Sequence, residues 1–217
     1  MKDIIIIGAG GFGREIKCLL DDINDFAEDN VYNIVGFVDD GIAKNTDIQN
    51  LKVLGSLDYL KKLDKNVYVC LGVGNPKVKQ LITSKLSGFN FPTLIHPTVS
   101  LSGYNITIGE GSIICKGVLL TCDIEIEKYV TVNLQCTIGH DVLINNFSSI
   151  MPSVNISGEV TLKENVYIGS GAILINQKTI GKNAIIGAGA VVTKDIPDNC
   201  TAVGAPAKPI KFHQKND

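Results

Sequence analysis

The carboxyl-terminal half of the chain carries a repeat of six residues, and this period restricts the fold more than any other feature. An α-helical stripe recurs about every 3.6 residues and the faces of a strand alternate every two, so neither element alone produces a period of six. A short strand followed by a turn does. Fifteen consecutive positions of the repeat are aliphatic: Ile108, Ile114, Leu120, Ile126, Val132, Ile138, Ile144, Ile150, Ile156, Leu162, Ile168, Leu174, Ile180, Ile186 and Val192.

Three such units can close one triangular coil of eighteen residues, which returns the chain to its starting edge about 4.8 Å higher. Five coils then form a prism roughly 24 Å tall, with the aliphatic residues inside and Gly or Asn in left-handed conformations at the corners. The pattern does not set the hand of the coil, because parallel crossovers are usually right-handed. We therefore predict a parallel β-helix for residues 97–217, and its left hand rests on the resemblance described below.

The first 96 residues have a different pattern, in which strands and helices alternate. We predict strands at 3–7, 33–38, 67–71 and 93–95, and helices at 13–23, 56–63 and 76–86. This order is typical of a small parallel sheet with crossover helices, a Rossmann-like α/β fold. The boundary is expected near His96-Pro97, which divides the chain into domains 1–96 and 97–217.

Composition excludes several classes of partner. The net charge is −2 with both signs scattered, so no basic stripe is present to bind nucleic acid or an anionic membrane. No apolar stretch is long enough for a signal peptide or a bilayer span, and we expect a cytoplasmic location. The six cysteines form no CxxC pair, which favours reduced core thiols over disulfides or a metal site.

A glycine-rich loop, Gly8-Ala9-Gly10-Gly11-Phe12-Gly13, lies between the first predicted strand and helix. Backbone amides and a helix N-terminus in this context can hold phosphate oxygens. Asp39 and Asp40 end the second strand, where a carboxylate can accept hydrogen bonds from a ribose or a base. Because the domain has room for only one mononucleotide half, we expect a nucleotide diphosphate ligand rather than a dinucleotide. The alternative is a glycine turn that only allows close packing. A second loop, Gly72-Val73-Gly74-Asn75, could line the same crevice.

His140 is the one histidine inside the repeats, in the corner Ile138-Gly139-His140-Asp141. It lies outside the aliphatic register, so its ring should project from the prism, where an imidazole can act as a general base and Asp141 can orient it. Steps of eighteen residues from His140 reach Gly158, Asn176 and Lys194. Gly158 would place a backbone amide beside the histidine as an oxyanion donor, and Lys194 could meet a phosphate of an extended co-substrate.

The whole chain resembles the NeuD/PglD-type sugar acyltransferases, which join a small Rossmann-like domain to a left-handed β-helix. The resemblance rests on the motifs GAGGFGRE, Val38-Asp39-Asp40, GVGN, Leu94-Ile95-His96-Pro97, Ile138-Gly139-His140-Asp141 and Val203-Gly204-Ala205-Pro206-Ala207-Lys208. It implies transfer of an acetyl group from acetyl-CoA to the 4-amino group of a nucleotide-linked sugar, or to a sugar hydroxyl. It also implies homotrimers whose active sites, with the CoA groove, lie between subunits.

The same resemblance assigns roles to individual residues. His140 matches the catalytic base and Asp141 its acidic partner, while Asn133 and Gly158 match residues near the acetyl group. Where relatives have histidines this chain has Phe12 and Ser149, and we expect altered sugar recognition. The predicted nucleotide-sugar contacts are Gly8, Gly10, Gly11, Phe12, Asp39, Asp40, Gly74 and Asn75, and the predicted CoA contacts are Gly158, Asn176, Gly187, Ala188, Lys194 and Lys208.

Three other classes remain as alternatives to N-acetylation by an enzyme of this kind. Sugar O-acetylation would use the same site. A nicotinamide oxidoreductase would use the glycine loop, but the N-terminal domain is small for it. A γ-type carbonic anhydrase shares the β-helix but needs three histidine ligands, and the repeats contain one.

Overall fold

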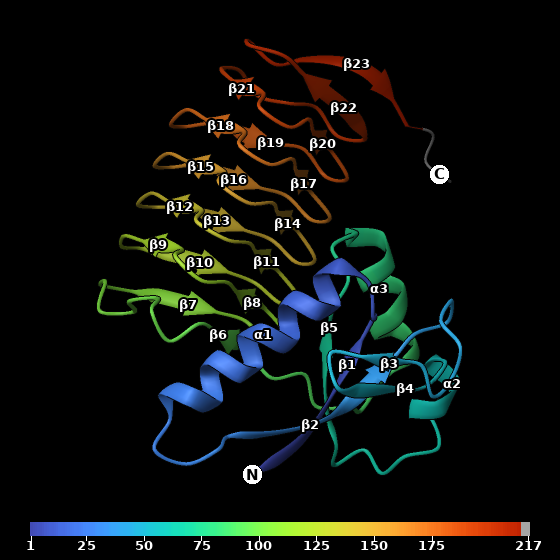
Figure 1. Cartoon of the computed structure of the whole chain (residues 1–217). Coiled ribbons are helices and arrows are strands. Elements are labelled where there is room, and N and C mark those ends of the chain that lie inside the picture. Colours follow the sequence, from blue (N-terminus) through green and yellow to red (C-terminus); the bar gives the residue numbers. More distant parts are fainter. Residues whose placement is uncertain (214–217) are drawn as a thin grey trace.

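The computed structural model describes residues 1–213, which form an α/β domain packed against a β-helix (Figure 1). The N-terminal sheet has the strand order β3-β4-β2-β1-β5, and all its neighbours run parallel except the β3–β4 hairpin. Its elements are β1 (Lys2–Ile7), α1 (Gly11–Phe26), β2 (Tyr32–Val38), β3 (Asp47–Ile48), β4 (Leu51–Gly55), α2 (Leu57–Leu60), β5 (Tyr68–Leu71) and α3 (Pro76–Lys85).

Strand β1, between β2 and β5 in the sheet, is buried on both sides from Ile4 to Ile7, which explains its run of four isoleucines. Ile4 and Ile6 pack with the apolar face of α1, and Ile5 and Ile7 pack in the second core with residues of α2. A strand covered on both faces reads as a continuous apolar run rather than an alternating one. The α/β fold predicted for the N-terminal half is confirmed.

The β-helix contains one short strand for each of the fifteen predicted repeat positions, and its strands form three faces (Figure 1). Neighbouring strands within a face run parallel, except that β23 pairs antiparallel with β22. The first face comprises β7 (Ile106–Ile108), β10 (Ile124–Ile126), β13 (Leu143–Ile144), β16 (Thr161–Leu162) and β19 (Thr179–Ile180). The second face comprises β6 (Leu94–Ile95), β8 (Ile113–Ile114), β11 (Thr131–Val132), β14 (Ser149–Ile150), β17 (Tyr167–Ile168), β20 (Ile185–Ile186), β22 (Cys200–Val203) and β23 (Lys208–Phe212). The third face comprises β9 (Leu119–Leu120), β12 (Thr137–Ile138), β15 (Asn155–Ile156), β18 (Ile173–Leu174) and β21 (Val191–Val192).

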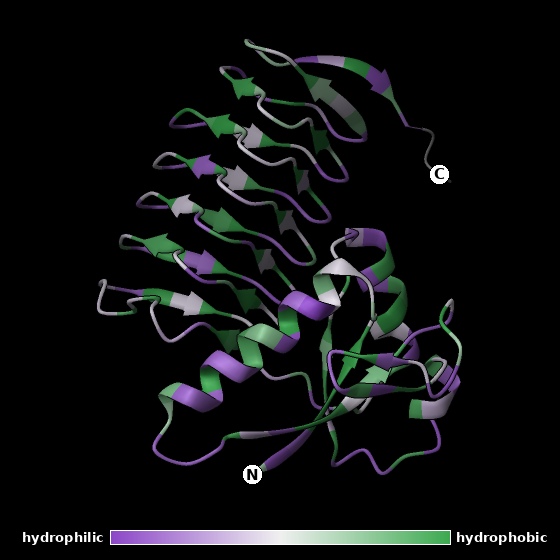
Figure 2. Ribbon diagram, in the orientation of Figure 1, coloured by the Kyte–Doolittle hydropathy of each residue, from purple (hydrophilic) through white to green (hydrophobic). Residues whose placement is uncertain are grey.

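The aliphatic residue of each repeat points into the prism and is shielded from solvent along the middle coils. Figure 2 shows hydrophobic segments, in green, that recur from coil to coil between paler and purple ones. The step between stacked residues is eighteen, as in Ile138–Ile156 and Leu174–Val192. It shortens to sixteen at Ile180–Ile196, where the last coil ends. The fold class, a left-handed β-helix after a Rossmann-like domain, agrees with the prediction.

Two details of the prediction are wrong. The strand at 93–95 was expected in the N-terminal sheet, but β6 pairs with β8 and so begins the second face of the β-helix. The chain touches the edge strand β5 only through the bridge Tyr68–Asn90 and then pairs with the prism, where Leu94 N and His96 N donate to Ser112 O and Ile114 O. The β3–β4 hairpin was not predicted, because its strands are short and lie in a polar stretch. The boundary near residue 96 stays a prediction.

The N-terminal domain lies on the second face and on the two corners that flank it. Lys79 of α3 binds the corner before β11, and Asp22 of α1 accepts hydrogen bonds from His96 and from Lys116. The corner between the third and first faces, which carries His140, is the one farthest from these contacts in the chain's path around the coil. Within one chain, His140 is therefore on the side of the prism away from the N-terminal domain.

Candidate active site

His140 and Asp141 form a hydrogen-bonded pair on the corner between the third and first faces. His140 Nδ1 lies 2.7 Å from Asp141 Oδ2, and about half of each side chain is exposed. Asp141 has a left-handed backbone, with φ of 57°, which turns the chain at this corner. Because the carboxylate accepts the Nδ1 proton, Nε2 is left as the basic nitrogen, and this tautomer follows from the hydrogen bond.

Gly158 lies directly beside the imidazole, one coil above it. A Cβ placed on Gly158 would lie 2.5 Å from both Cε1 and Nε2 of His140, so no larger residue fits against the ring. The Gly158 carbonyl accepts from Gln177 N, whereas its N–H donates to no backbone acceptor within residues 1–213. The predicted neighbourhood of His140 and Gly158 is therefore confirmed as geometry, and a free amide beside the base suits an oxyanion.

The predicted CoA residues are divided between two corners of the prism. Asn176 continues the His140 column and is exposed, and Lys194 lies beyond Val192, where the eighteen-residue register ends. Gly187 and Ala188 lie on the corner between the second and third faces, and Lys208 begins β23. One chain therefore does not bring these residues into a single groove.

The glycine loop and the aspartates form a crevice at the carboxyl ends of β1 and β2. Asp39 Oδ2 accepts from Ala9 N and Oδ1 accepts from Gly41 N, both at 2.8 Å, which ties the glycine loop to the end of β2. Asp40 is exposed and accepts from Leu57 N at 2.7 Å through Oδ1. The crevice has a volume of about 200 Å³ and is lined by Ile7, Gly8, Val38, Asp39, Asp40, Gly41, Leu57, Val73, Val78 and Ile82.

The glycine loop leads from Gly8, which lines this crevice, to the N-terminus of α1. Its cap residue Gly10 supplies no side-chain hydrogen bond, so amides of the first turn remain available for phosphate oxygens. Gly10 and Gly11 have no neighbour within 4 Å of an added Cβ. At Gly13, by contrast, a Cβ would lie 1.9 Å from Gly8 O. Gly13 is thus needed for packing, and Gly10 and Gly11 leave room for a ligand.

The second loop connects the crevice to the β-helix. Asn75 Oδ1 accepts from Val78 N at 3.2 Å and caps α3, and a Cβ on Gly74 would lie 3.7 Å from Met151 Cε. Asn133 lies in the coil below Met151 at the same corner, only 4% exposed. Its Oδ1 accepts from Leu134 N. Asn133 is therefore close to the crevice side of the chain and not to His140.

Ser149 does not lie on an accessible surface. It is fully buried, and its hydroxyl has no hydrogen-bond partner among the described residues. The buried hydroxyl of Ser149 is not accessible to a sugar in this arrangement, and the altered sugar recognition expected from Phe12 and Ser149 stays a prediction. Phe12 is half-buried and packs with the core beneath α1.

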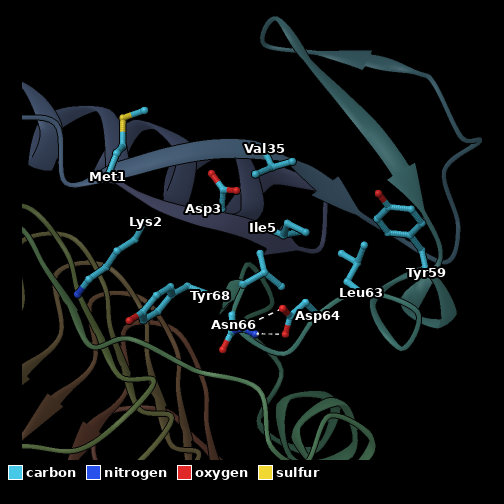
Figure 3. Close-up of a pocket in the computed structure, with 11 residues that line it drawn as sticks. Met1, Lys2, Asp3, Ile5, Val35, Tyr59, Leu63, Asp64, Asn66 and Tyr68 are labelled. Atoms are coloured by element: carbon cyan, nitrogen blue, oxygen red, sulfur yellow. Dashed lines mark hydrogen bonds between the residues drawn. The ribbon is translucent and has the colours of Figure 1, made fainter.

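A larger hollow of about 590 Å³ opens at the opposite edge of the N-terminal sheet (Figure 3). It is lined by residues at the amino ends of β1 and β5, including Lys2, Asp3 and Tyr68, and by Tyr59 and Leu63. Ligands of open α/β sheets bind at the carboxyl ends of the strands, and none of the predicted site residues lies in this hollow. We therefore place the nucleotide in the smaller crevice.

Sequence reasoning missed Lys79. This residue is 1% exposed, and burial holds the pKa of its amine well below the usual value. Nothing in the pattern of α3 distinguishes it from the exposed Lys77 two residues earlier.

The described cysteines are all free thiols. Burial raises the pKa of Cys115 to about 12 and of Cys136 to about 11, which keeps these thiols protonated and unreactive at neutral pH. In residues 1–213 no three His, Cys, Asp or Glu side chains are grouped as metal ligands would be. No helix of that same part of the chain is long and apolar enough to cross a bilayer.

Comparison with known proteins shows which class has this architecture. Residues 3–86 match the PglD N-terminal domain family, and residues 159–194 match the bacterial transferase hexapeptide family. The acetyltransferase domain of PglB from Neisseria gonorrhoeae, solved with acetyl coenzyme A, is 31% identical and superposes with a TM-score of 0.85 over 96% of this chain and 99% of that one. This chain is thus an acyltransferase of the hexapeptide-repeat class, as predicted.

Two further relatives narrow the class. GDP-perosamine N-acetyltransferase of Escherichia coli O157:H7 is 32% identical over 171 residues, or 78% of this chain and 76% of the relative. A mutant perosamine N-acetyltransferase from Caulobacter crescentus, solved with CoA and GDP-perosamine, is 27% identical with a TM-score of 0.83, covering 97% and 98% of the two chains. The chain belongs to the family of acetyl-CoA-dependent N-acetyltransferases that act on nucleotide-linked amino-sugars, and acetyl-CoA is its co-substrate.

Proposed function

We propose that this enzyme transfers the acetyl group of acetyl-CoA to the 4-amino group of a GDP-linked amino-deoxysugar. The observation that carries the proposal is the pairing of His140 with Asp141 at 2.7 Å beside the free Gly158 amide. These groups supply a base and an oxyanion donor, the two requirements of acyl transfer from a thioester to an amine.

The chemistry follows from the orientation of the three groups. Nε2 of His140 takes a proton from the amine as its nitrogen attacks the thioester carbonyl, and Asp141 stabilises the imidazolium. The Gly158 N–H donates to the carbonyl oxygen as negative charge develops there. The C–N bond forms, the C–S bond breaks, and the proton held by His140 passes to the leaving thiolate, which regenerates the base.

The choice of GDP is supported by two observations. The E. coli relative is named for a GDP-linked sugar. Asp40 is exposed beside the crevice, and Leu57 N uses one lone pair of its Oδ1, which leaves Oδ2 and the second lone pair of Oδ1 as acceptors for a base. Guanine presents two adjacent N–H donors to a carboxylate, whereas uracil and thymine present one N–H flanked by two carbonyl oxygens. A pyrophosphate would lie against the N-terminus of α1.

The site requires two copies of the chain. His140 follows Asn133 by seven residues along the coil, which corresponds to roughly 20 Å of extended chain. The third face therefore lies between His140 and the side of the prism that carries the crevice. The third face also exposes Leu119 and Ile173, by 64% and 42%. We infer a homotrimer in which this face is covered and the sugar from one crevice reaches His140 of the next subunit, with CoA between the two prisms.

A cytoplasmic location belongs to the same proposal, because nucleotide-linked sugars and acetyl-CoA are both available there.

The direct test of the reaction is a thiol-release assay with acetyl-CoA and a panel of GDP-, UDP- and dTDP-linked 4-amino-sugars, with product mass measured. We expect turnover with an amine and the highest kcat/KM with GDP. Turnover only with a sugar that lacks the amine would contradict N-acetylation and move the activity to a hydroxyl.

Replacing the base tests the site itself. His140→Ala should reduce kcat by about 10² or more, because general base catalysis typically contributes that much. His96→Ala is an unsuitable control, since His96 is buried; His213→Ala, at the far end of the prism, leaves the site intact. Wild-type kcat in His140→Ala would exclude the proposed role.

A further inference from the structure

Lys79 of α3 extends from the N-terminal domain into the β-helix, where its amine is enclosed. Its Nζ donates to Tyr129 O at 2.8 Å, to Ser148 O at 3.1 Å and to Thr131 Oγ1 at 3.3 Å. All three acceptors belong to the β-helix, and no carboxylate lies within ion-pair distance of the amine in the described structure. Burying an amine without a counter-ion is costly, and an apolar side chain would pack at lower cost.

The three acceptors satisfy the three N–H groups of the amine, and they fix α3 in two directions. Tyr129 and Thr131 lie in the coil that ends with His140, and Ser148 lies in the next coil, which contains Gly158. Lys79 therefore holds α3 at the height along the prism at which the base and the oxyanion donor also lie. In a trimer with its axis parallel to the prisms, equal heights in neighbouring subunits coincide.

The side of α3 next to Lys79 forms part of the nucleotide crevice. Val78 and Ile82 line it, and the loop Gly72–Asn75 runs directly into the first turn of the helix. Lys79 N also donates to Asn75 O at 3.0 Å. Any movement of α3 along the prism would thus carry the crevice wall and the loop with it.

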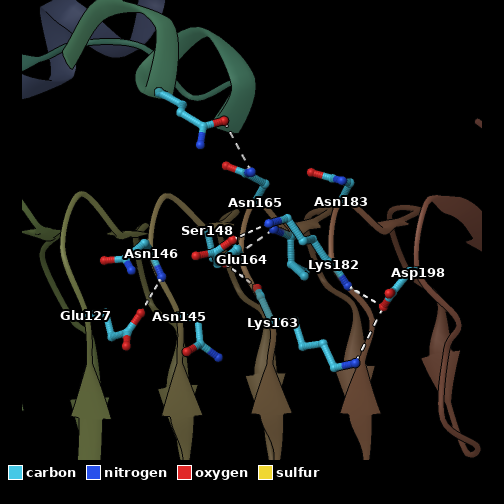
Figure 4. Close-up of polar contacts among 12 residues, drawn as sticks. Glu127, Asn145, Asn146, Ser148, Lys163, Glu164, Asn165, Lys182, Asn183 and Asp198 are labelled. Atoms are coloured by element: carbon cyan, nitrogen blue, oxygen red, sulfur yellow. Dashed lines mark hydrogen bonds and ion pairs between the residues drawn. The ribbon is translucent and has the colours of Figure 1, made fainter. Parts of the chain in front are cut away.

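Other polar contacts between α3 and the prism are weak. Figure 4 shows Asn165 at the corner beneath the helix, where its Nδ2 lies 3.4 Å from Gln80 Oε1. The Asn165 Oδ1 and Ser149 Oγ atoms are buried at this junction with no partner among the described residues. The second attachment of the domain, Asp22 to His96 and Lys116, is on α1. Removing Lys79 should therefore loosen α3 without detaching the domain.

We propose that Lys79 is a positioning residue for the transfer reaction: it sets the height of the crevice on the prism, so that the sugar amine meets the His140–Gly158 pair of the next subunit. The proposal rests on the function proposed above. Misplacing a bound reactant by about 1 Å can reduce its reactivity about 10²-fold. A looser α3 should therefore weaken the use of the nucleotide-sugar and leave acetyl-CoA binding unchanged.

The experiment compares Lys79→Met with Lys77→Met, which makes the same chemical change on the exposed side of α3. For Lys79→Met we expect kcat/KM for the nucleotide-sugar to fall about 10- to 100-fold with an unchanged KM for acetyl-CoA, and faster hydrogen exchange in residues 72–85. Thr131→Val, which removes one acceptor at constant volume, should change the same quantities in the same direction by less. It also carries the test if Lys79→Met does not fold.

The positioning role would be overturned if Lys79→Met reduced kcat/KM equally for the nucleotide-sugar and for acetyl-CoA. It would also be overturned if both values of kcat/KM stayed at the wild-type level. If the wild-type enzyme itself acetylates no amino-sugar, the proposed function fails instead. In that case hydrogen exchange still tests whether Lys79 holds α3 on the prism. Unchanged exchange in residues 72–85 of Lys79→Met would overturn that claim independently of activity.

Discussion

At the scale of single residues, the contact between His140 and Gly158 gives the sharpest expectation. The backbone of Gly158 is not left-handed, so alanine is sterically allowed there except for the imidazole that its methyl would meet at 2.5 Å. Gly158→Ala should therefore displace the His140 ring and reduce kcat at least 10-fold while the prism stays folded. The measurement is kcat together with thermal unfolding, and full activity in a folded variant would show that the ring does not act from this position.

Asp22 gives an expectation about pH. The hydrogen bond from His96, and then Lys116, hold the pKa of the Asp22 carboxyl below its ordinary value of 3.8, against opposing desolvation. A lowered pKa in the folded state stabilises the fold above the ordinary value, and this contribution is lost as the pH falls through the folded-state pKa. Asp22→Asn should lower Tm at pH 7 by about 1–3 °C, because the pair is partly exposed.

The comparison for Asp22→Asn is thermal unfolding of both proteins at pH 7 and at successively lower pH. The Tm difference should shrink as the pH drops below 3.8. A difference that grows on acidification would contradict the assignment of the charge to Asp22.

The residues that could be predicted from the sequence are those with a local signal. His140 and Gly158 could be predicted as neighbours because residues eighteen apart stack on each other in the coil. The glycine loop could be predicted because it follows a strand and begins a helix. Lys79 could not, since its burial depends on how two domains pack and not on its own helix. The left-handed corners were expected at Gly and Asn, but Tyr129, Phe147 and Glu159 adopt them too, with φ of 58–64°. The packed coil imposes that conformation despite its cost.

At the scale of elements, the turn from β1 to α1 separates packing from binding. Gly11 has no neighbour within 4 Å of an added Cβ and begins α1, where an acidic side chain is favourable to the helix. Gly11→Asp should therefore fold normally but repel a pyrophosphate, and KM for the nucleotide-sugar should rise at least 10-fold with KM for acetyl-CoA unchanged. Gly11→Asn is the uncharged control with the same shape.

Gly13→Ala offers the converse case, because its Cβ would lie 1.9 Å from Gly8 O. We expect it to lower Tm and not to change binding selectively. If Gly11→Asp bound the nucleotide-sugar as tightly as Gly11→Asn, the crevice would be assigned to the wrong loop.

At the two ends of the prism the sequence pattern did not predict the strand pairing. The prism was predicted strand by strand, because each repeat buries its aliphatic residue in the same way. β6 was assigned to the wrong sheet, because a two-residue strand shows which residues are apolar but not which edge they join. The shortened last coil, where the step falls to sixteen, was also hidden, since its aliphatic residues keep the period of six as far as Val192.

At the scale of the whole molecule, the residues of the proposed site are divided between two corners of the prism. The crevice and Asn133 lie on the side of the second face, and His140 with Gly158 lies across the third face. The sequence could indicate the crevice residues and the His140–Gly158 pair but not the distance between them. That distance depends on how the coil closes into three faces. In the homotrimer proposed above, this separation would let each subunit complete the site of its neighbour.

Mixing two impaired variants tests this arrangement. His140→Ala keeps a working crevice and Gly11→Asp keeps a working base, so each alone should retain about a tenth of the wild-type turnover or less at low nucleotide-sugar concentration. If the site combines two subunits, co-expressed mixed trimers at equal ratio should recover about a quarter of the wild-type sites, because each site needs an intact crevice and an intact base from adjacent copies. Recovery near a quarter of wild-type turnover is the expected result, and no recovery from trimers shown to be mixed would contradict a site shared between subunits.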